Sequence, residues 1–348
     1  MKQIKTNTIV IGAGQVGLAL GYYLKQANIE YIILEQGFEI GEQWRKRFDS
    51  LTLFTPNSLN RLPAYSKPIS QSEFQTKDEF ADYLQAYQQH HQLNVQCNQK
   101  VNSIKQGDMG GYIISTDERT FYAKHIVLAN GAFQDGAGND NGVKYSDEQN
   151  VIKHYQVNDL SDKKIAQQLV LVVGDGASGR QIAKQLAKNN QVYLAQGRTR
   201  HLIKHKLLGI NIFHWLRASG LLTLNKNFSL AQWIKGRDPF PDTQINDRTL
   251  MNAGVRFLPK LTALDSVAHF AGGEKIVIDS VVWATGYRNR YDFIHVADVL
   301  NSNGDITTDK LPKGFFCAGL AWQHNRASAL IYGAKFEAKR VVDEITKL

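Results

Sequence analysis

Residues 8–36 read TIVIGAGQVGLALGYYLKQANIEYIILEQ, and this stretch decides the fold. Its first four residues, 8–11, are rich in β-branched side chains, which is typical of a buried parallel strand. Apolar residues then recur at helical spacing as far as Leu24, and a second apolar run follows at 31–34. The pattern therefore predicts a strand–helix–strand unit.

Three glycines join the first predicted strand to the helix. Gly12, Gly14 and Gly17 have the GxGxxG spacing, which permits a tight turn, close approach of a pyrophosphate and close packing of the helix on the strand. Glu35 ends the second strand, where a carboxylate can accept hydrogen bonds from ribose hydroxyls. Because strand, helix and acid all lie where dinucleotide binding needs them, the stretch favours a nucleotide site over a glycine-rich turn without a ligand.

Length and composition limit the remaining possibilities. A chain of 348 residues is too long for one ordinary core, so two or three packed units are expected. No apolar run approaches the roughly 20 residues that a membrane-spanning helix needs. The N-terminus leads directly into the first strand without room for a signal peptide, so a cytoplasmic protein is expected. Cys97 and Cys317 are the only cysteines, far apart in sequence, which argues against a disulfide framework or a dithiol centre.

The charge balance is basic, with 41 Lys and Arg against 32 Asp and Glu and a net charge of +9. Such an excess can serve a nucleic acid or an anionic membrane surface. The basic residues are scattered, apart from Arg198, Arg200, Lys204 and Lys206. The charge is therefore interpreted as a solvated surface that also favours polyanionic cofactors. No nucleic-acid partner and no metal site are predicted.

The opening pattern recurs in the middle of the chain. Residues 169–173 read LVLVV, a buried strand by the same criteria. Gly174, Gly176 and Gly179 repeat the GxGxxG spacing, and a helical pattern and another short apolar run come next. Two complete dinucleotide turns in one chain are far more specific than one.

The second turn differs from the first in the residues just past its second strand. No acid stands in the place of Glu35; the chain reads QGRTR from residue 196, with Arg198 and Arg200. A cationic side chain there suits a ribose that carries a 2′-phosphate. The first site is therefore interpreted as an FAD site and the second as an NADP site. A solvated surface is a nearly equal alternative for the two arginines.

Other segments give simpler predictions. Thr76 and Glu79 form a capping box, which predicts a helix that runs to about His91. Alternating and apolar runs predict short strands at 101–105, 112–116, 120–122 and 125–129. Residues 134–150 are rich in Gly, Asn and Asp and predict a flexible connection.

Two later segments complete the sequence pattern. The apolar stretch 207–224 is too short to cross a membrane and is interpreted as a substrate lid or an interdomain helix, with a membrane-facing amphipathic piece as the alternative. Strands ending in small-residue turns are predicted at 280–286 and 315–319, and a terminal helix is predicted from Ser328.

With these pieces in order, the chain resembles the class B flavin-dependent monooxygenases, which use one FAD and one NAD(P)H on a single polypeptide. The shared pieces are GAGQVG, GEQWRKRFDSLTLFTP, VVGDGASG, ATGY at 284–287 and GLAWQHNRASAL from Gly319. The chain is similar to short bacterial members and to the plant indole-pyruvate monooxygenases, over essentially its full length. The expected fold is α/β, with two Rossmann-like dinucleotide-binding domains. The FAD domain would comprise 1–157 and 284–348, and the NAD(P) domain, 158–283, would be inserted into it.

The resemblance, together with the glycine patterns, gives a set of candidate site residues. The catalytic candidates are Arg45, Phe54, Thr55 and Tyr155. The cofactor-binding candidates are Gly12, Gly14, Gln15, Gly17, Glu35, Gln36, Gln43, Trp44, Val101, Ala129, Gly131, Gly174, Gly176, Ala177, Ser178, Gly179, Arg198, Arg200, Thr285, Gly286, Gly319 and Gln323.

The implied function is NAD(P)H-dependent monooxygenation. NADPH, with NADH as an option, would reduce FAD, and a peroxyflavin would oxygenate a sulfide, an amine or a ketone. The partners would be molecular oxygen and a small-molecule substrate, and a homodimer is an open option. Two alternatives remain, namely an FAD-dependent reductase of a quinone or small acceptor, and a non-catalytic redox sensor.

Three departures from the family pattern bear on these alternatives. The fingerprint before the second glycine turn is replaced by residues 150–155, NVIKHY, in which Tyr155 fits the terminal aromatic. Phe54 stands where animal-type members carry Asn beside the flavin, and residues 129–131 read Ala-Asn-Gly in place of Ala-Thr-Gly. The altered fingerprint favours the reductase alternative.

Overall fold

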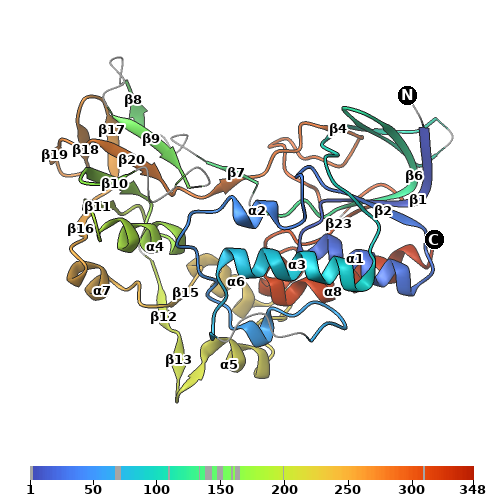
Figure 1. The fold of residues 1–348 in the computed structure, drawn as a ribbon, viewed down its shortest axis with the longest axis horizontal. Coiled ribbons are helices and arrows are strands. Elements are labelled where there is room, and N and C mark those ends of the chain that lie inside the picture. Colours follow the sequence, from blue (N-terminus) through green and yellow to red (C-terminus); the bar gives the residue numbers. More distant parts are fainter. Residues whose placement is uncertain are drawn as a thin grey trace.

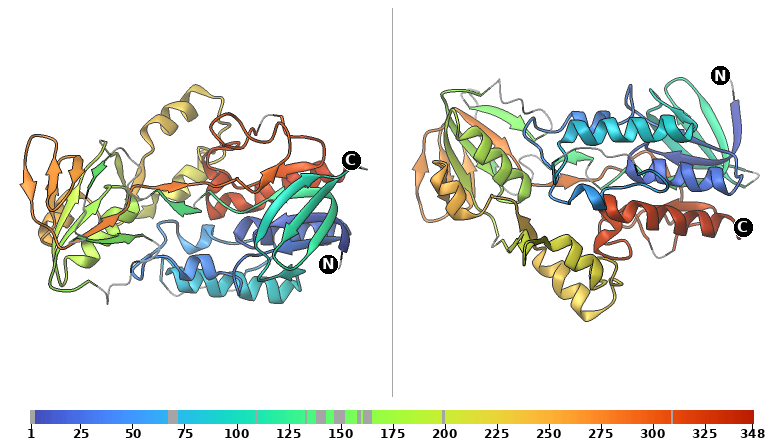
Figure 2. Two further views of the ribbon diagram at one scale, coloured as in Figure 1. Left: turned by 90° about the horizontal axis from the view of Figure 1, so that it is seen from above. Right: turned by 60° about the horizontal axis from the view of Figure 1, so that its bottom comes forward.

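The computed structural model describes residues 3–66, 72–108, 110–132, 134–137, 143–146, 152–157, 160, 165–198, 200–308 and 310–348. Two β-sheet bodies lie at opposite ends of an elongated molecule (Figure 1). A third part, the arm, comprises residues 202–237 and projects beneath them as a set of strands and helices. Two further views show the same arrangement (Figure 2). The helices are α1 (Gln15–Gln26), α2 (Glu42–Arg45), α3 (Lys77–His91), α4 (Ala177–Leu186), α5 (Ile212–Ala218), α6 (Ser229–Arg237), α7 (Asp247–Asn252) and α8 (Ala334–Ile345). Short 3₁₀ helices include η1 (Asn57–Leu59), η3 (Arg326–Ala329) and η4 (Ile331–Gly333).

The first sheet is built around β1 (Gln3–Ile11), the strand that opens the sequence pattern. β1 pairs in parallel with β2 on one side and with β6 on the other. The strand order is β22 (Ile294–His295), β4 (Val101–Gln106), β5 (Tyr112–Thr116), β6 (Thr120–Leu128), β1, β2 (Tyr31–Leu34) and β3 (Val95–Gln96), and β23 (Phe315–Cys317) also pairs with β6. β4, β5 and β6 form the antiparallel part, as the alternating runs predict.

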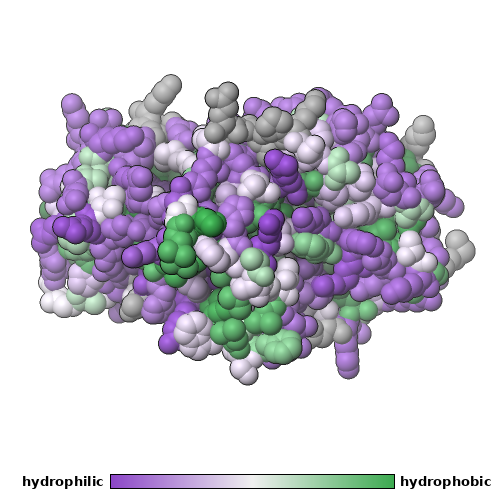
Figure 3. All heavy atoms as spheres, turned by 90° about the horizontal axis from the view of Figure 1, so that it is seen from below, coloured by the Kyte–Doolittle hydropathy of each residue, from purple (hydrophilic) through white to green (hydrophobic). Residues whose placement is uncertain are grey.

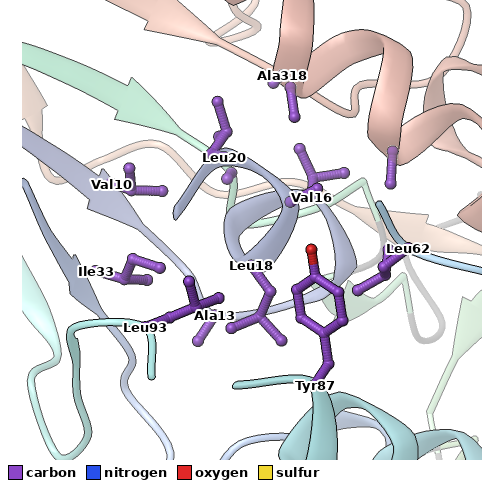
Figure 4. Close-up of a cluster of buried hydrophobic side chains, with 14 of the residues drawn as sticks. Val10, Ala13, Val16, Leu18, Leu20, Ile33, Leu62, Tyr87, Leu93 and Ala318 are labelled. Carbon is purple, nitrogen blue, oxygen red and sulfur yellow. The ribbon is translucent and has the colours of Figure 1, made fainter. Parts of the chain in front are cut away.

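Helices α1, α3 and α8 lie together on one face of this sheet (Figure 1). Val10 and Ile33 from the sheet meet Leu18 and Leu20 of α1, and Tyr87 of α3 reaches the same cluster (Figure 4). All five side chains are fully buried. Burying an apolar side chain of this size stabilises the fold by roughly 1.5–3 kcal/mol. The helical spacing in the opening stretch therefore defines the face that packs on the sheet.

The second sheet is parallel throughout. Its order is β16 (Arg256–Leu258), β11 (Gln191–Ala195), β10 (Leu169–Val173), β20 (Ser280–Trp283) and β9 (Lys153–Gln156). The buried run Val170–Val173 lies in the middle of it, as the continuous apolar pattern predicts. α4 packs beside β10 and β11 and supplies Ile182 and Leu186 to the core on that face. This body repeats the strand–helix–strand unit of the first.

Smaller sheets complete the described part of the fold. They are β19 (Lys275–Ile276), β18 (Ala268–Phe270), β17 (Leu261–Leu264) and β8 (Lys144–Tyr145); β12 (Leu202–Lys204) with β15 (Phe240–Asp242); β13 (Lys206–Leu207) with β14 (Ile210–Asn211); and β7 (Asp135–Gly136) with β21 (Tyr287–Arg288). β7 leaves the first body and β21 returns to it, paired antiparallel. Figure 1 places β7 between the two bodies.

This topology confirms the predicted fold class, with one Rossmann-like unit inserted into another. The strands of the second sheet all come from the chain between β6 and β23, which belong to the first sheet. The domain bounds themselves stay a prediction. Pairing of β9 with β20 favours a boundary before residue 152 over one at 157.

Two details differ from the sequence-based expectations, and one agrees with them. β6 is one strand where the pattern predicts two, because Lys124 interrupts the apolar run from an exposed position and the ladder continues through it. α8 begins at Ala334 and not at Ser328, because Asn325 and Ser328 form a capping box that starts the 3₁₀ helix η3 instead. The capping box at Thr76 and Glu79 is confirmed, and α3 follows it.

The segment 207–224 is also not a single helix. Gly209, at φ +77°, closes the β13–β14 hairpin, α5 follows, and Gly220, at φ +74°, lies just past its end. Of the predicted connection 134–150, residues 138–142 and 147–150 lie outside the described residues, and the remainder contributes β7 and β8. In the described part of the chain, no helix has the length and apolarity that crossing a bilayer requires.

The loop after α2 joins the two bodies. Phe48 is 1% exposed and packs with Val157, Val170 and Leu250 in the core of the second body. Five residues later Leu53 is buried in the core of the first body. The chain therefore crosses between the bodies twice within this loop, and the Phe48 ring holds the crossing in place.

Replacing Phe48 with Ala should destabilise the protein strongly, by about 3–5 kcal/mol, because the ring leaves a cavity in a closed core. The thermal unfolding midpoint, followed by circular dichroism, measures the effect. Phe38→Ala is the matched control, since Phe38 is 80% exposed and its loss should change stability by no more than about 0.5 kcal/mol. Equal midpoints for the two variants would contradict the anchoring role of Phe48.

Candidate functional site

The first glycine turn has the geometry that its spacing predicts. Gly12 adopts φ +99°, and a Cβ there would lie 2.8 Å from the Ala129 carbonyl oxygen. A Cβ on Gly17 would lie 1.8 Å from the Gly12 carbonyl oxygen, so α1 can pack this close only with glycine. Gly14 is different, because its backbone is extended and no described atom lies within 4 Å of a Cβ placed on it. The first and third glycines serve the fold, and the second opens onto free space.

The start of α1 is suited to an anion. Gly14 is the N-cap and supplies no side chain to cap the helix, so no side-chain oxygen occupies the first amides, beginning with Gln15. These amides and the helix dipole together favour phosphate groups. The open space at Gly14 lies at the same helix start. The residues therefore fit the pyrophosphate of a dinucleotide.

Glu35 follows directly after β2, at the position that the sequence predicts, and is buried. One carboxylate oxygen, Oε2, accepts a hydrogen bond from the Ala13 amide at 2.8 Å, and Oε1 accepts one from the Gly37 amide at 2.9 Å. The carboxylate thus holds the glycine turn in shape from the neighbouring strand. Each oxygen keeps a second lone pair for a further donor such as a ribose hydroxyl. Gln36, the next residue, is exposed.

The second glycine turn is a close copy of the first. Gly174 adopts φ +105°, and a Cβ there would lie 2.4 Å from the Ala284 carbonyl oxygen. A Cβ on Gly179 would lie 1.8 Å from the Gly174 carbonyl oxygen. Gly176 is an extended N-cap without a side-chain cap, and Ala177 and Ser178 begin α4. The backbone at Gly176 therefore leaves room for a phosphate group, as the backbone at Gly14 does in the first turn.

A second loop packs against each turn. Residues 129–131 follow β6 beside the first turn, and residues 284–286 follow β20 beside the second. Gly131 and Gly286 adopt φ +79° and +105°, and each faces open space. Thr285 takes the place that Asn130 has in the first loop, and the Asn130 side-chain oxygen is buried without a partner among the described residues. The structure brings these predicted residues together in two matching pairs of loops.

Arg200 lies over the second turn. Its Nε atom is 3.3 Å from Asp175 Oδ1, and its guanidinium approaches the open face of Gly176 within 3.8 Å of a Cβ placed there. The Asp175 side chain is almost fully buried, and the Arg180 side chain also pairs with it at 3.5 Å. Arg180 further pairs with Asp247 at 2.6 Å. A buried carboxylate thus orients Arg200 toward the place where a nucleotide would lie.

Arg198 points elsewhere. Its guanidinium pairs with Asp238 at 3.1 Å, and both side chains are more than half exposed. An exposed pair of this kind contributes little to stability. The structure therefore separates the two arginines that the sequence leaves equivalent. Arg200 adjoins the glycine turn, and Arg198 lies on the solvated surface.

The α2 residues lie in the segment that leads from β2 to Phe48 in the second body. Arg45 pairs with Glu39 at 2.8 Å and with Asp82 at 2.9 Å. The Trp44 ring packs edge-on against Phe80 with ring centres 4.9 Å apart, and Gln43 is exposed. The two carboxylates and the aromatic contact favour structural roles for Arg45 and Trp44. Their assignment to a flavin stays a prediction.

Thr55 belongs to a buried polar network. Its hydroxyl donates to Asn60 Oδ1 at 2.6 Å, and Asn60 Nδ2 donates to Gln75 Oε1 at 3.0 Å. All three residues are at most 5% exposed. The neighbouring Phe54 ring stacks on Phe213 of α5, with ring centres 6.0 Å apart and planes 24° apart. The network holds the backbone next to Phe54 in place. Phe54 and Phe213 thus form an apolar pair where the arm joins the first body.

Further predicted residues lie on strands or just after them. Val101 begins β4 and Tyr155 lies within β9, where it packs against the core that contains Phe48. A Cβ on Gly319 would lie 2.8 Å from Val16 of α1, so the loop after β23 closes on the first turn. Asn150 and Val151 of the altered fingerprint lie outside the described residues.

Gln323 is used within its own turn. Its Nε2 donates to the Cys317 carbonyl oxygen at 2.8 Å, and its Oε1 accepts from the Leu320 amide at 3.2 Å. The side chain is 7% exposed. This geometry favours a role in shaping the loop after β23, and the assignment of Gln323 to the flavin edge stays a prediction.

The two cysteines are free and carry protonated thiols at neutral pH. Burial raises the pKa of the Cys317 thiol to about 12. Burial also raises the pKa of the Cys97 thiol, and the nearby Glu35 carboxylate adds to the effect. Because the thiolate is the reactive form, these residues are poor redox groups. Thiol–disulfide chemistry therefore has no support at either position.

Two open hollows, of about 410 and 380 Å³, lie elsewhere. The larger is lined by residues of the β13–β14 hairpin and of the loop at 56–58. The smaller lies between the loop at 50–53 and α4. Neither is lined by a residue of the two glycine turns, so the turns and not these hollows define the candidate cofactor sites.

Several site residues are absent from the sequence-based set, notably Asp175, Arg180, Asn60, Gln75 and Phe213. One signal was available for Arg180. A cation near the N-terminus of α4 opposes the helix dipole, and such a position implies an acidic partner. Asn60 and Phe213 had no such signal, because their contacts join segments that are distant in sequence.

Comparisons with known proteins agree with this geometry. Residues 9–212 match the pyridine nucleotide-disulphide oxidoreductase family. The chain is 35% identical over 347 residues to a protein of Geobacillus kaustophilus named uncharacterized oxidoreductase CzcO-like, covering 97% of this chain and 98% of that protein. It is 26% identical over 349 residues to a probable indole-3-pyruvate monooxygenase of Arabidopsis thaliana, covering 89% of this chain and 81% of that protein.

A solved structure of a flavin-containing monooxygenase from Stenotrophomonas maltophilia has the same fold. Its TM-score is 0.79 at 20% identity, and the alignment covers 99% of each chain. That likeness confirms the two-body Rossmann-type architecture. The sequence matches and the paired glycine turns together show that the chain belongs to the pyridine nucleotide-disulphide oxidoreductase family, among its members that resemble the class B flavin monooxygenases.

Proposed function

We propose that the protein is an NADPH- and FAD-dependent monooxygenase that acts on a small molecule. The observation that carries the proposal is the duplication of the glycine turn, with φ +99° and +105° at the first glycine and the same 1.8 Å approach at the third. One chain thus contains two glycine turns with the same geometry, and each could bind a dinucleotide. The relatives that carry a functional name are monooxygenases or oxidoreductases, which favours oxygenation over simple binding.

Each cradle takes one cofactor in this proposal. The first turn, with Glu35 on the neighbouring strand, holds FAD, and the second turn, with Arg200 above it, holds NADPH. When bound, the pair supplies hydride transfer from the nicotinamide to the flavin and activation of molecular oxygen. NADH is the weaker option, because the guanidinium of Arg200 would lack the 2′-phosphate as partner.

The chain itself binds, orients and excludes water. The amides at the starts of α1 and α4 bind the phosphates. The Phe54–Phe213 stack places apolar surface where the sequence resemblance puts the reactive face of the flavin, and it limits the entry of water. Thr55 donates its only proton to Asn60, so its hydroxyl serves the fold and not proton transfer. No acid–base pair from the protein is required, because the cofactors carry the chemistry.

The reductase and sensor alternatives make different demands. A reductase would consume NADPH with a quinone and leave no oxygenated product, and a sensor would bind both nucleotides without turnover.

We place the protein in the cytoplasm, where both pyridine nucleotides and the reducing conditions that suit free cysteines are found.

The two glycine turns give a matched pair of variants. Gly14→Val introduces a side chain into open space, and the Cβ of Gly176→Val makes only an ordinary contact, 3.8 Å, with Arg200; both positions are extended, so both proteins should fold. Gly14→Val should purify without flavin, because its side chain occupies the approach of the pyrophosphate. Gly176→Val should stay yellow and lose NADPH binding. Flavin absorbance and NADPH titration measure both, and a yellow Gly14→Val protein would show that the first turn has been misassigned.

Arg200 and Arg198 give a second pair. Arg200→Ala should raise the KM for NADPH at least about tenfold, because a charge-assisted hydrogen bond to phosphate contributes roughly 1.5–3 kcal/mol. The KM for NADH should hardly change. Arg198→Ala is the control and should leave both values near those of the wild type, since Arg198 pairs with Asp238 at the surface. Equal losses for NADPH and NADH in Arg200→Ala would refute contact with the 2′-phosphate.

The function itself is tested by following oxygen and product. Wild-type protein with FAD should oxidise NADPH in an oxygen-dependent manner, convert small aryl sulfides to sulfoxides, and release part of the oxygen as hydrogen peroxide. Phe54→Asn should raise the hydrogen peroxide formed per NADPH at least about twofold, because the polar group admits water, with a smaller effect on flavin reduction. Phe54→Leu keeps an apolar side chain and should resemble the wild type.

Product analysis separates the alternatives. NADPH oxidation that continues without oxygen when a quinone is added, with no oxygenated sulfide, amine or ketone, would assign the protein to the reductases. Stoichiometric flavin with negligible NADPH oxidation under all conditions would assign it to the sensors.

A further inference from the structure

The arm beneath the two bodies, residues 202–237, has an unusual composition. It contains β12, β13, β14, α5 and α6, and it projects away from both sheets (Figures 1 and 2). The larger stretch 176–237 contains eleven Lys and Arg and no Asp or Glu. Because the net charge of the chain is +9, the remainder of the molecule carries a charge of −2. Six of the eleven lie in the arm itself, which contains no acidic residue and therefore has a formal charge of +6.

The same arm exposes large apolar side chains. Of the thirteen that are exposed among the described residues, seven belong to the arm: Leu207, Leu208, Ile210, Trp215, Phe228, Leu230 and Trp233. Leu208, at the hairpin tip, is 84% exposed. Figure 3, a view from below, shows hydrophobic residues gathered in this region and bordered by hydrophilic ones. Grouped apolar exposure of this kind marks an interaction surface.

The arm is an ordered piece of structure and not a loose loop. The Trp215 indole donates to the Leu207 carbonyl oxygen at 3.1 Å and so ties α5 to the hairpin. Asn211 caps α5 by accepting from the Phe213 amide at 3.0 Å, and Phe213 is buried beneath. The exposed leucines and tryptophans are therefore held outward by a defined scaffold.

Helix α6 has an apolar side that is open to solvent. Ala231 is its only buried residue, although Leu230 and Trp233 lie three positions apart on one side. Both are about half exposed. Arg237 stacks its guanidinium over the Trp233 ring at 4.0 Å. The helix thus presents an apolar face with a cation at its edge.

We propose that this arm docks on the surface of an anionic lipid bilayer. Leucine and tryptophan side chains at a hairpin tip and on a short helix are suited to the boundary between headgroups and acyl chains. The lysines and arginines around them would meet lipid phosphates, with their carbon stems along the apolar surface. The arm adds no membrane-spanning element, so the attachment is peripheral and reversible.

The charge pattern selects this occupant over others. In a two-fold dimer through the arm, the same patch would face its own copy and bring like charges together. A nucleic acid could pair its phosphates with the basic residues, but its bases stack on aromatic rings and would leave the aliphatic side chains exposed. These side chains are Leu207, Leu208, Ile210 and Leu230. Among the described residues, Glu73 pairs with Lys206 of the arm at 2.8 Å, and this one carboxylate balances only one of the six basic residues there.

Vesicle flotation tests the proposal with the FAD-loaded protein. Wild type should float with vesicles of equal phosphatidylglycerol and phosphatidylcholine and stay at the bottom of the gradient with pure phosphatidylcholine. Sodium chloride at high concentration should release it, because salt screens the exposed charges. Lys235→Gln with Arg237→Gln should weaken partitioning roughly 25-fold, since each basic residue near an anionic surface contributes a factor of about five.

A second double variant removes the apolar contribution. Leu208→Ser with Trp233→Ser should weaken partitioning at least about tenfold. Matched controls lie outside the arm. Met251→Ser with Val277→Ser removes two exposed apolar side chains, and Lys100→Gln with Lys105→Gln removes two exposed charges. Both control proteins should float as the wild type does.

Three results would overturn the proposal. The first is wild-type protein that does not float with either vesicle. The second is equal loss in the arm variants and their controls, which would make the effect one of general charge or hydrophobicity. The third is a wild-type dimer in light scattering that becomes monomeric in Leu208→Ser with Trp233→Ser and never floats, which would assign the face to a second copy of the chain.

Discussion

The fold rests on one steric constraint, the contact between a helix and the carbonyl of the glycine that ends the strand before it. A Cβ on Gly17 would approach the Gly12 oxygen to 1.8 Å, and Gly179 repeats the contact with Gly174 at the same distance. Only glycine permits this approach. The close packing in turn brings the uncapped helix start to the sheet edge, where the second glycine leaves room for a phosphate. Fold and candidate binding site therefore share a cause.

This contact between a strand end and the next helix involves residues that are close in sequence. The GxGxxG spacing was therefore enough to predict it. The turns, their flanking strands and the capping box at Thr76 could be predicted because the deciding residues lie within a few positions of one another. Contacts between distant segments leave no such local pattern. The crossing of Phe48 into the second core, the Thr55–Asn60–Gln75 network and the division of 207–224 into a hairpin and a short helix all depend on tertiary packing.

The sequence alone does not distinguish the roles of Arg198 and Arg200 beside the second glycine turn. Arg198 and Arg200 are two residues apart and equally suited to a 2′-phosphate by composition. What separates them is Asp175, buried between the first two glycines of the second turn and paired with both Arg180 and Arg200. Burying this carboxylate would be costly without such partners. The acid in the glycine turn therefore requires cations, and one of them comes to lie beside the nucleotide cradle.

The arm and the candidate site are joined through one short helix. On α5, Phe213 turns inward and stacks on Phe54, and Trp215 turns outward and is bound to the hairpin through Leu207. The polar network around Thr55 fixes the other side of that stack. Because α5 is only seven residues long, about two turns carry both the apolar pair and the outer Trp215 contact.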